Sequence, residues 1–109
     1  HVNPDRSLSF FAAVETGVVL TRMRRGDMRQ HLLQMLQQIE REVGPPQLII
    51  GCDCILRRLE AEVTGVLPQL SQLLQRFRVV GFNTYGEHYS GVHINQTFTG
   101  VAIGQIPND

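Results

Sequence analysis

The middle of the chain reads Gln47-Leu48-Ile49-Ile50-Gly51-Cys52-Asp53-Cys54-Ile55-Leu56-Arg57-Arg58-Leu59-Glu60. Residues 47–51 form a short apolar run with adjacent β-branched residues, which predicts a buried strand. Residues 54–63 carry apolar residues at helical spacing, which predicts a helix with Asp53 as its N-cap. A buried strand that leads directly into a helix is typical of a sheet with helices packed on it.

A second helix is predicted ahead of this segment, over residues 27–43. Leu32, Leu36, Ile39 and Val43 recur at three- and four-residue intervals and so line one helical face. Asp27 is a natural N-cap, and the glycine and two prolines at 44–46 end the helix.

Two strands are predicted before that helix, over residues 8–14 and 18–23. The first is rich in aromatic, β-branched and small apolar residues, and the second is a further apolar run. Residues 15–17, which end in Gly17, would join the two strands in a β-hairpin.

The remainder of the chain predicts one more helix and two more strands. The helix covers residues 68–77 and begins at Pro68, and a strand follows over residues 78–83. After a glycine-punctuated loop, a strand over residues 92–104 bends at Gly100. The predicted order is β-β-α-β-α-α-β-β. It indicates a single domain over residues 1–109 of the α/β (α+β) class, with a mixed, mainly antiparallel sheet and helices packed on it.

Composition limits the function classes. The 109 residues include ten basic and ten acidic residues, so there is no net charge to attract nucleic acid or an anionic membrane. All ten basic residues are arginine, whose planar guanidinium binds carboxylates and phosphates through paired hydrogen bonds. No apolar stretch approaches the length of a membrane span, and the first residues do not resemble a signal peptide. We therefore expect a cytoplasmic protein.

Cys52 and Cys54 are one residue apart, which is too close for an ordinary structural disulfide and fits reduced thiols. If the helix begins here, its N-terminus would favour a reactive thiolate at Cys54. The alternative is that Cys54 is a small buried hydrophobic residue. A zinc site would need two further ligands, for which His88 and His93 are the nearest candidates.

Two polar segments are candidates for a ligand site. Residues 84–89 concentrate a carboxylate, an imidazole and two phenols on a predicted loop, where Glu87 would orient His88 or accept a ligand amine. The alternative is an exposed connection with an aromatic cover over the core. His93, Asn95 and Thr97 share one face of the predicted last strand, which is either solvated or the wall of a polar pocket.

Recognisable catalytic machinery is missing from the sequence. It contains no nucleophile elbow, phosphate-binding loop, dinucleotide fingerprint or metal-spaced histidine pair, so we expect that the protein is not an enzyme. An enzyme that uses Cys54 with His88 or His93 remains the alternative.

Three segments resemble the C-terminal portion of the FIST domain, named for F-box and intracellular signal transduction proteins. They are residues 48–60, then Val80-Gly81-Phe82-Asn83-Thr84-Tyr85-Gly86-Glu87, then His93-Ile94-Asn95-Gln96-Thr97-Phe98-Thr99. The resemblance implies a sensory, ligand-binding module that accompanies bacterial histidine kinases, diguanylate cyclases or chemotaxis-type receptors, with an N-terminal FIST half as its neighbour. It implies a small ligand such as an amino acid, or haem, since a bacterial subset is similar to haem-binding nitric oxide sensors.

The resemblance also implies the wall of a ligand pocket, made of Cys54, Arg57, Tyr85, Gly86, Glu87, His93, Asn95, Gln96 and Thr97. Chemically, Arg57 or Arg58 would hold an anionic group and Glu87 a cation, which a zwitterionic amino acid satisfies. A haem iron would take His93, His88 or Tyr85 as its ligand, in that order. The alternative function is a protein-interaction module that forms a homodimer through an exposed apolar face or a free sheet edge.

Overall fold

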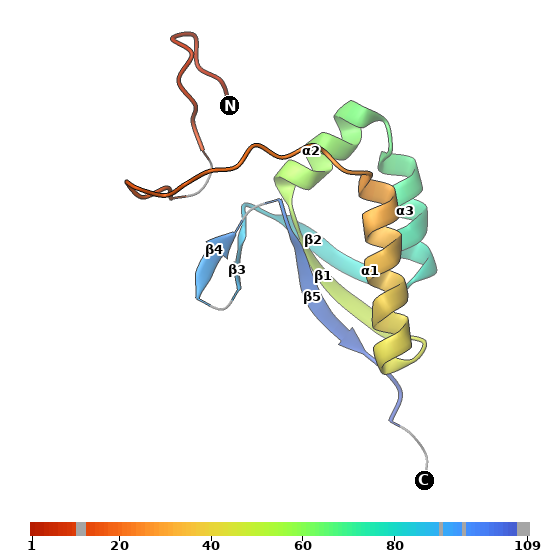
Figure 1. The fold of residues 1–109 in the computed structure, drawn as a ribbon. Helices are drawn as coiled ribbons and strands as arrows, with labels where there is room; N and C mark the ends of the chain where they lie inside the picture. The colour runs from red at the N-terminus through yellow and green to blue at the C-terminus, as the bar shows by residue number, and fades with distance from the viewer. Residues whose placement is uncertain (11–12, 90, 95, 107–109) are drawn as a thin grey trace.

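The computed structural model describes residues 1–10, 13–89, 91–94 and 96–106, although not the side chains of Tyr89, Val92 and His93. Within these ranges, three helices and five strands follow an extended N-terminal arm (Figure 1). In chain order they are α1 (Met28–Val43), β1 (Leu48–Cys54), α2 (Ile55–Thr64), α3 (Leu67–Arg76), β2 (Val79–Thr84), β3 (Glu87–Tyr89), β4 (Val92–Ile94) and β5 (Phe98–Ile103). The predicted α/β class is confirmed.

The main sheet has three strands in the order β2-β1-β5. Strand β1 is parallel to β2 and antiparallel to β5, so the sheet is mixed as predicted. The connection from β1 to β2 runs through α2 and α3, the crossover that a parallel pair requires. Strands β3 and β4 form a separate antiparallel ribbon beyond the carboxyl ends of β1 and β2 (Figure 1).

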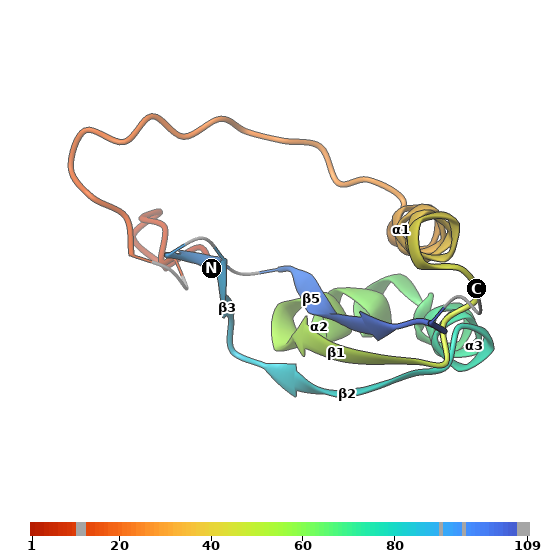
Figure 2. The same ribbon diagram turned by 90° about the horizontal axis from the view of Figure 1, so that it is seen from below.

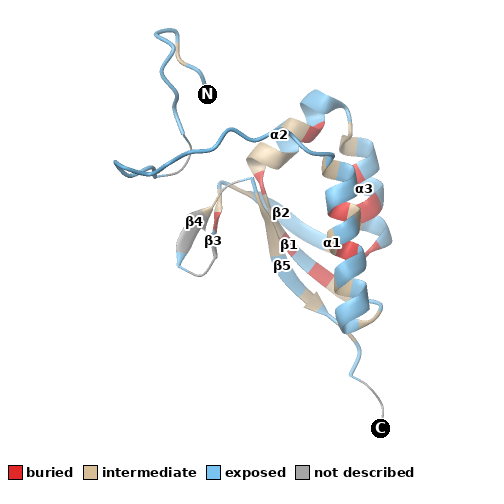
Figure 3. Ribbon diagram, in the orientation of Figure 1, coloured by how far each residue is buried: buried red, intermediate tan, exposed pale blue. Residues whose placement is uncertain are grey.

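The helices pack on one face of the main sheet, and the core lies between them and β1 (Figures 2 and 3). Leu36 of α1, Ile49 of β1 and Ala61 of α2 are almost completely buried, and α3 adds Leu70 and Leu73. Side chains alternate between the two faces of a strand, so every second residue of these strands points away from the helices. The large apolar side chains on that opposite face are exposed: Ile50, Val80, Phe82, Val101 and Ile103.

Local sequence explains where the helices begin and end. The Asp27 side chain accepts a hydrogen bond from the backbone N–H of Gln30, at 3.0 Å, which confirms it as the N-cap of α1. Gly44 ends α1, and Gly65 ends α2 in the left-handed conformation with φ of 73°. Pro68 lies in the first turn of α3, where its missing N–H costs nothing.

A row of glycines crosses the centre of the sheet. Gly81, Gly51 and Gly100 are paired in register on three neighbouring strands. A Cβ atom on Gly81 would overlap the carbonyl oxygen of Gly51, and one on Gly51 would collide with the ring of Phe98. The strands and the Phe98 ring therefore approach more closely here than side chains would allow.

The predicted N-terminal hairpin is wrong for the residues that the structure describes. Residues 13–26 contain no strand, and the only pairing in residues 1–10 is an isolated bridge between Val2 and Leu8. Residues 11–12 of the predicted first strand lie outside the described residues. Val19 is 89% exposed. A two-stranded hairpin is marginal in water without a surface to cover its apolar side chains, and the large apolar residues described in this arm are exposed.

Two further details differ from the prediction. The last strand does not bend at Gly100 but is divided ahead of it into β4 and β5, close to Gln96, which has φ of 53°. Gly100 lies within the regular ladder of β5. Asp53 is not a helix cap, because β1 continues to Cys54, and Cys54 occupies the N-cap position without a side-chain hydrogen bond.

No helix within the described ranges combines the length and the hydropathy needed to cross a bilayer.

Candidate functional site

The candidate site lies where the parallel strands β1 and β2 end. Ligands of open α/β sheets bind at this end, because the chain leaves the sheet there and the loops diverge. Asp53 and Asn83 are paired in register near the ends of the two strands. A cavity of about 440 Å³ opens beside them, between the helix-facing side of the sheet and helices α2 and α3.

The cavity has one apolar wall and one polar wall. Leu67, Leu70 and Leu74 of α3 form much of the apolar wall. The polar groups come from the strand ends and from the helices: Asp53, Arg57, Arg58, Ser71 and Asn83. Such a combination of apolar enclosure with a few converging polar groups is typical of small-molecule sites.

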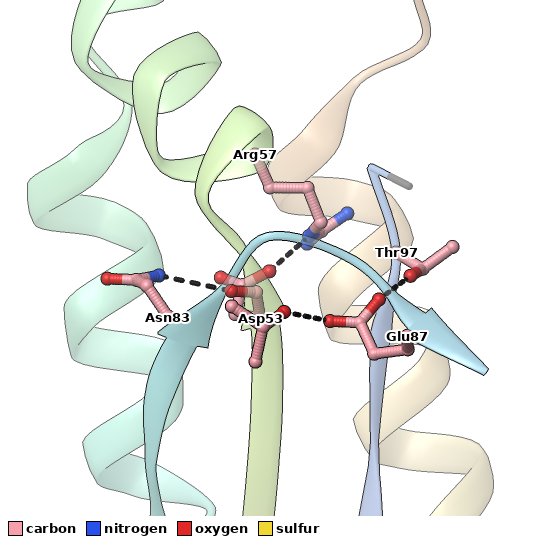
Figure 4. A network of polar contacts seen from close by, with 6 residues as sticks. Asp53, Arg57, Asn83, Glu87 and Thr97 are labelled. Atoms are coloured by element: carbon pink, nitrogen blue, oxygen red, sulfur yellow. Dashed lines mark hydrogen bonds and ion pairs between the residues drawn. The ribbon is translucent and has the colours of Figure 1, made fainter. Parts of the chain in front are cut away.

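Asp53 and Arg57, which both line the cavity, form an ion pair. The Arg57 Nε atom lies 2.7 Å from Asp53 Oδ1, and the two side chains are 18% and 26% exposed, respectively. The side-chain amide of Asn83 donates a hydrogen bond of 3.3 Å to the Asp53 carbonyl oxygen and so ties β2 to β1 (Figure 4).

The pKa of Asp53 is raised above its ordinary value of 3.8. Burial is the largest cause, because it penalises the charged carboxylate, and the nearby Glu87 carboxylate acts in the same direction. The Arg57 guanidinium opposes both effects and lowers the pKa without cancelling them. Asp53 is therefore a carboxylate with an unfavourable environment that a further cation or hydrogen-bond donor would improve.

Glu87 is the buried charged residue of this region, at 8% exposed. One carboxylate oxygen accepts a hydrogen bond from the hydroxyl of Thr84, and the other accepts one from the hydroxyl of Thr97 (Figure 4). The backbone N–H of Cys54 donates to the Thr97 carbonyl oxygen at 3.0 Å. Glu87 thus connects the ends of β1 and β2 with the segment that enters β5.

The structure brings together four of the residues that the family resemblance indicated: Cys54, Arg57, Glu87 and Thr97. Among the other described residues, Gln96 lines a separate cavity together with Arg57. Tyr85 is 89% exposed, Gly86 is half-buried, and His88 and Gln96 are exposed.

The predicted polar row on one strand is wrong. Strand β4 ends at Ile94, so Thr97 does not share a strand with His93. The backbone of His93 is paired with that of His88 across the β3–β4 ribbon, while the His93 side chain and residue Asn95 lie outside the described residues.

Cys54 is completely buried, which supports its interpretation as a small hydrophobic residue, while Cys52 is half-buried. Within the described part of the chain, no group of three or more histidine, cysteine or acidic side chains is placed to hold a metal, and the side chain of His93, a candidate zinc ligand, lies outside that part. Of the three candidate haem ligands, Tyr85 and His88 are exposed, and the side chain of His93 lies outside the described residues.

Sequence reasoning missed the roles of Asp53, Asn83 and Ser71. Asp53 was expected only to cap a helix, and the two others were not singled out. The available signal was positional: Asp53 and Asn83 come at the ends of strands that are separated by a helical crossover, where side chains of parallel strands meet.

Comparison with known proteins gives one result. A search of curated proteins and a search of solved structures each found no match. The family model described as FIST C domain matches residues 1–90, which include α1 to α3 and the whole of β1 and β2. This family is associated at a general level with sensory modules of signal transduction. The chain therefore belongs to the FIST C domain family.

Proposed function

We propose that the chain is a sensory module that binds a small amphipathic ligand in the 440 Å³ cavity at the ends of β1 and β2. The observation that carries the proposal is the cavity itself, in which an apolar helix wall faces the Asp53–Arg57 pair and Arg58. A purely structural ion pair would not need an adjoining cavity of this size.

A zwitterionic amino acid with an apolar side chain suits this lining. Arg58 is about half exposed and pairs with Glu62 on the helix surface through its Nε atom, so the rest of its guanidinium can bind a carboxylate. The ammonium group would lie against Asp53, where it would relieve the cost of the partly buried carboxylate. We assign the binding of the ligand's ammonium group to Asp53 rather than to Glu87, because both carboxylate oxygens of Glu87 already accept hydrogen bonds from threonine hydroxyls.

Calorimetric titration of the full chain with leucine and with 4-methylpentanoate, which lacks the amine, tests the two contacts separately. Arg58→Gln should weaken the binding of both compounds by about 10- to 100-fold, the value of a charge-assisted hydrogen bond. Asp53→Asn should weaken the binding of leucine and leave that of 4-methylpentanoate nearly unchanged.

Arg29→Gln is the matched control, since Arg29 is exposed on α1 and lies outside the cavity lining. It should bind leucine like the wild type. A titration of all twenty amino acids without a binding signal, or an Arg58→Gln protein with wild-type affinity, would contradict the proposal.

Signalling would follow if the ligand favours one arrangement of α2 and α3 against the sheet, because both sides of the cavity would contact it. In this proposal the chain acts in the bacterial cytoplasm with an N-terminal FIST half and a histidine kinase or diguanylate cyclase as its output partner. It performs no catalysis of its own. The rate of kinase autophosphorylation, measured with and without leucine and with the Arg58→Gln chain, tests this step.

Haem, with nitric oxide sensing, is the second ligand class that the resemblance implied. It would be held by the β3–β4 ribbon rather than by the cavity, because His88 and His93 are paired there. Absorption spectra during titration with ferric haem test it. A stoichiometric Soret band that is lost in His93→Ala or His88→Ala would support haem, and a spectrum identical to free haem would exclude it for this chain.

A further inference from the structure

Within the described part of the chain, no helix or strand covers one face of the main sheet. We call it the open face and define it by Ile50 of β1, Val80 and Phe82 of β2, and Val101 and Ile103 of β5. Each of these side chains is at least 43% exposed, and Phe82 reaches 65%. An apolar sheet face that is open to water is a site of association.

The sheet edges carry nothing that would oppose such association. Strands β2 and β5, the two edges, contain no charged residue and no proline. Natural edge strands commonly carry such residues, because these prevent pairing with other chains. The rim of the open face is therefore compatible with an added strand.

The N-terminal arm, residues 1–26, also exposes apolar side chains. Its described part presents a series of large apolar side chains to water: Val2, Leu8, Phe10, Val14, Val18, Val19, Leu20 and Met23. Its base is attached to the body by the ion pair between Arg25 and Glu60, 3.0 Å apart. From there the arm runs clear of the main sheet in both views (Figures 1 and 2).

The accessible surface area of the chain is larger than that of a compact monomer. The chain exposes 8744 Å², whereas a compact monomer of 12.3 kDa exposes about 6,100 Å². The radius of gyration is 16.5 Å, against about 13 Å for a compact domain of this length. Each chain thus exposes about 2,600 Å² more surface than a compact monomer of the same mass. If two chains buried this surface against each other, the total buried area would reach that of an obligate homodimer interface, about 2,000–5,000 Å² or more.

The open face alone is too small for this role. Three strands spaced about 4.8 Å apart, with six residues of about 3.3 Å each, give a footprint of roughly 300 Å². A stable interface needs about 800 Å² from each partner. Contact between two open faces would therefore be insufficient, and the arms must take part.

We propose that the chain forms a homodimer by arm exchange, in which the arm of each copy covers the open face of the other. The apolar arm residues then contact the open face, and the predicted strand at 18–23 forms against the partner's sheet. The same surface patches serve on both copies, as a two-fold interface requires.

Light scattering coupled to size exclusion tests the assembly, with two glutamate substitutions and a control. Val101→Glu charges the open face, and Val19→Glu charges the arm. Val63→Glu is the control, because Val63 is 84% exposed on α2, on the helix side of the sheet. The wild type and the control should have twice the 12.3 kDa chain mass.

The two interface variants should be monomers, with a dimer dissociation constant raised at least about 100-fold, because each buries an unpaired carboxylate twice in a symmetric interface. Val19→Glu keeps the test valid if Val101→Glu fails to fold, since the arm is outside the core. A wild-type monomer, whether extended or compacted by its own arm, would overturn the proposal. So would a Val19→Glu protein that dimerises as tightly as the wild type.

Discussion

Replacing Thr97 with valine tests whether the Glu87 carboxylate holds the end of the sheet together. The substitution removes one hydroxyl donor at nearly constant volume and leaves the carboxylate, which is 8% exposed, with one fewer hydrogen bond. Hydrogen bonds to charged groups contribute about 1.5–3 kcal/mol, and little water can replace this one. We expect the free energy of unfolding to fall by about 2 kcal/mol.

The assay is urea unfolding followed by far-ultraviolet circular dichroism. Thr99→Val is the matched control, because Thr99 is a half-buried threonine of the same region that takes no part in the two Glu87 bonds. It should change the free energy of unfolding by no more than about 0.5 kcal/mol.

A Glu87→Gln background separates the charge from the packing. With a neutral acceptor the Thr97→Val cost should drop to about 1 kcal/mol, the value of an ordinary hydrogen bond. The double-mutant cycle then gives a coupling of about 1 kcal/mol between the two positions. If Thr97→Val costs no more than Thr99→Val, or if the coupling is zero, the carboxylate does not connect these segments as argued.

Three further predictions concern strands β1 and β2, with Gly65 at the end of α2 as a comparison. Burial raises the pKa of Asp53 in the folded protein above its unfolded value of 3.8. The contribution of Asp53 to the free energy of unfolding should therefore grow as pH falls through the folded pKa toward 3.8, and it should be lost as pH rises. Asp53→Asn should remove this pH-dependent component when unfolding is measured at a series of pH values. Gly81→Ala should cost about 3 kcal/mol or more in chemical unfolding, because its Cβ overlaps backbone. Gly65→Ala, with open space but φ of 73°, should cost only about 1 kcal/mol. Iodoacetamide should label half-buried Cys52 faster than buried Cys54. Fast labelling of Cys54 would instead support the alternative that the protein is an enzyme with Cys54 as its nucleophile.

The sequence predicted best what is decided within a few residues. The capping of α1 by Asp27 depends on a side chain and an N–H three positions away, and its end at Gly44 depends on one backbone conformation. The failed hairpin at residues 8–23 shows the limit of such signals. Apolar periodicity states what a segment could bury, but whether a surface exists to bury it depends on the rest of the assembly.

The site shows the same limit at a longer range. The resemblance brought Arg57, Glu87 and Thr97 to attention, and the structure places them within one polar network. Asp53 has a capping residue's usual place before a helix, so its local interpretation was reasonable but wrong. Its contact with Asn83 joins positions 30 residues apart, and no local pattern encodes a pairing of that kind.

The cavity and the open face share two residues of β2, Val80 and Phe82, which would connect ligand binding to assembly. Strand β2 is an edge of the sheet, so Phe82 is the more exposed of the two at 65%. A ligand that contacts Phe82 would then meet a different surface in the dimer than in the monomer. Thermodynamic linkage requires that any resulting difference in ligand affinity appears, with the same factor, in the dimerisation constant.

This coupling is measurable by sedimentation of the chain with and without leucine. We expect leucine to change the dimer dissociation constant by about 5-fold or more, the lower end of typical coupling between sites. Phe82→Ala should reduce that change, whereas Val63→Ala, on the outer surface of α2, should preserve it. Equal dissociation constants with and without bound leucine would mean that dimerisation does not report ligand occupancy, and the signal would then have to leave through α2 and α3.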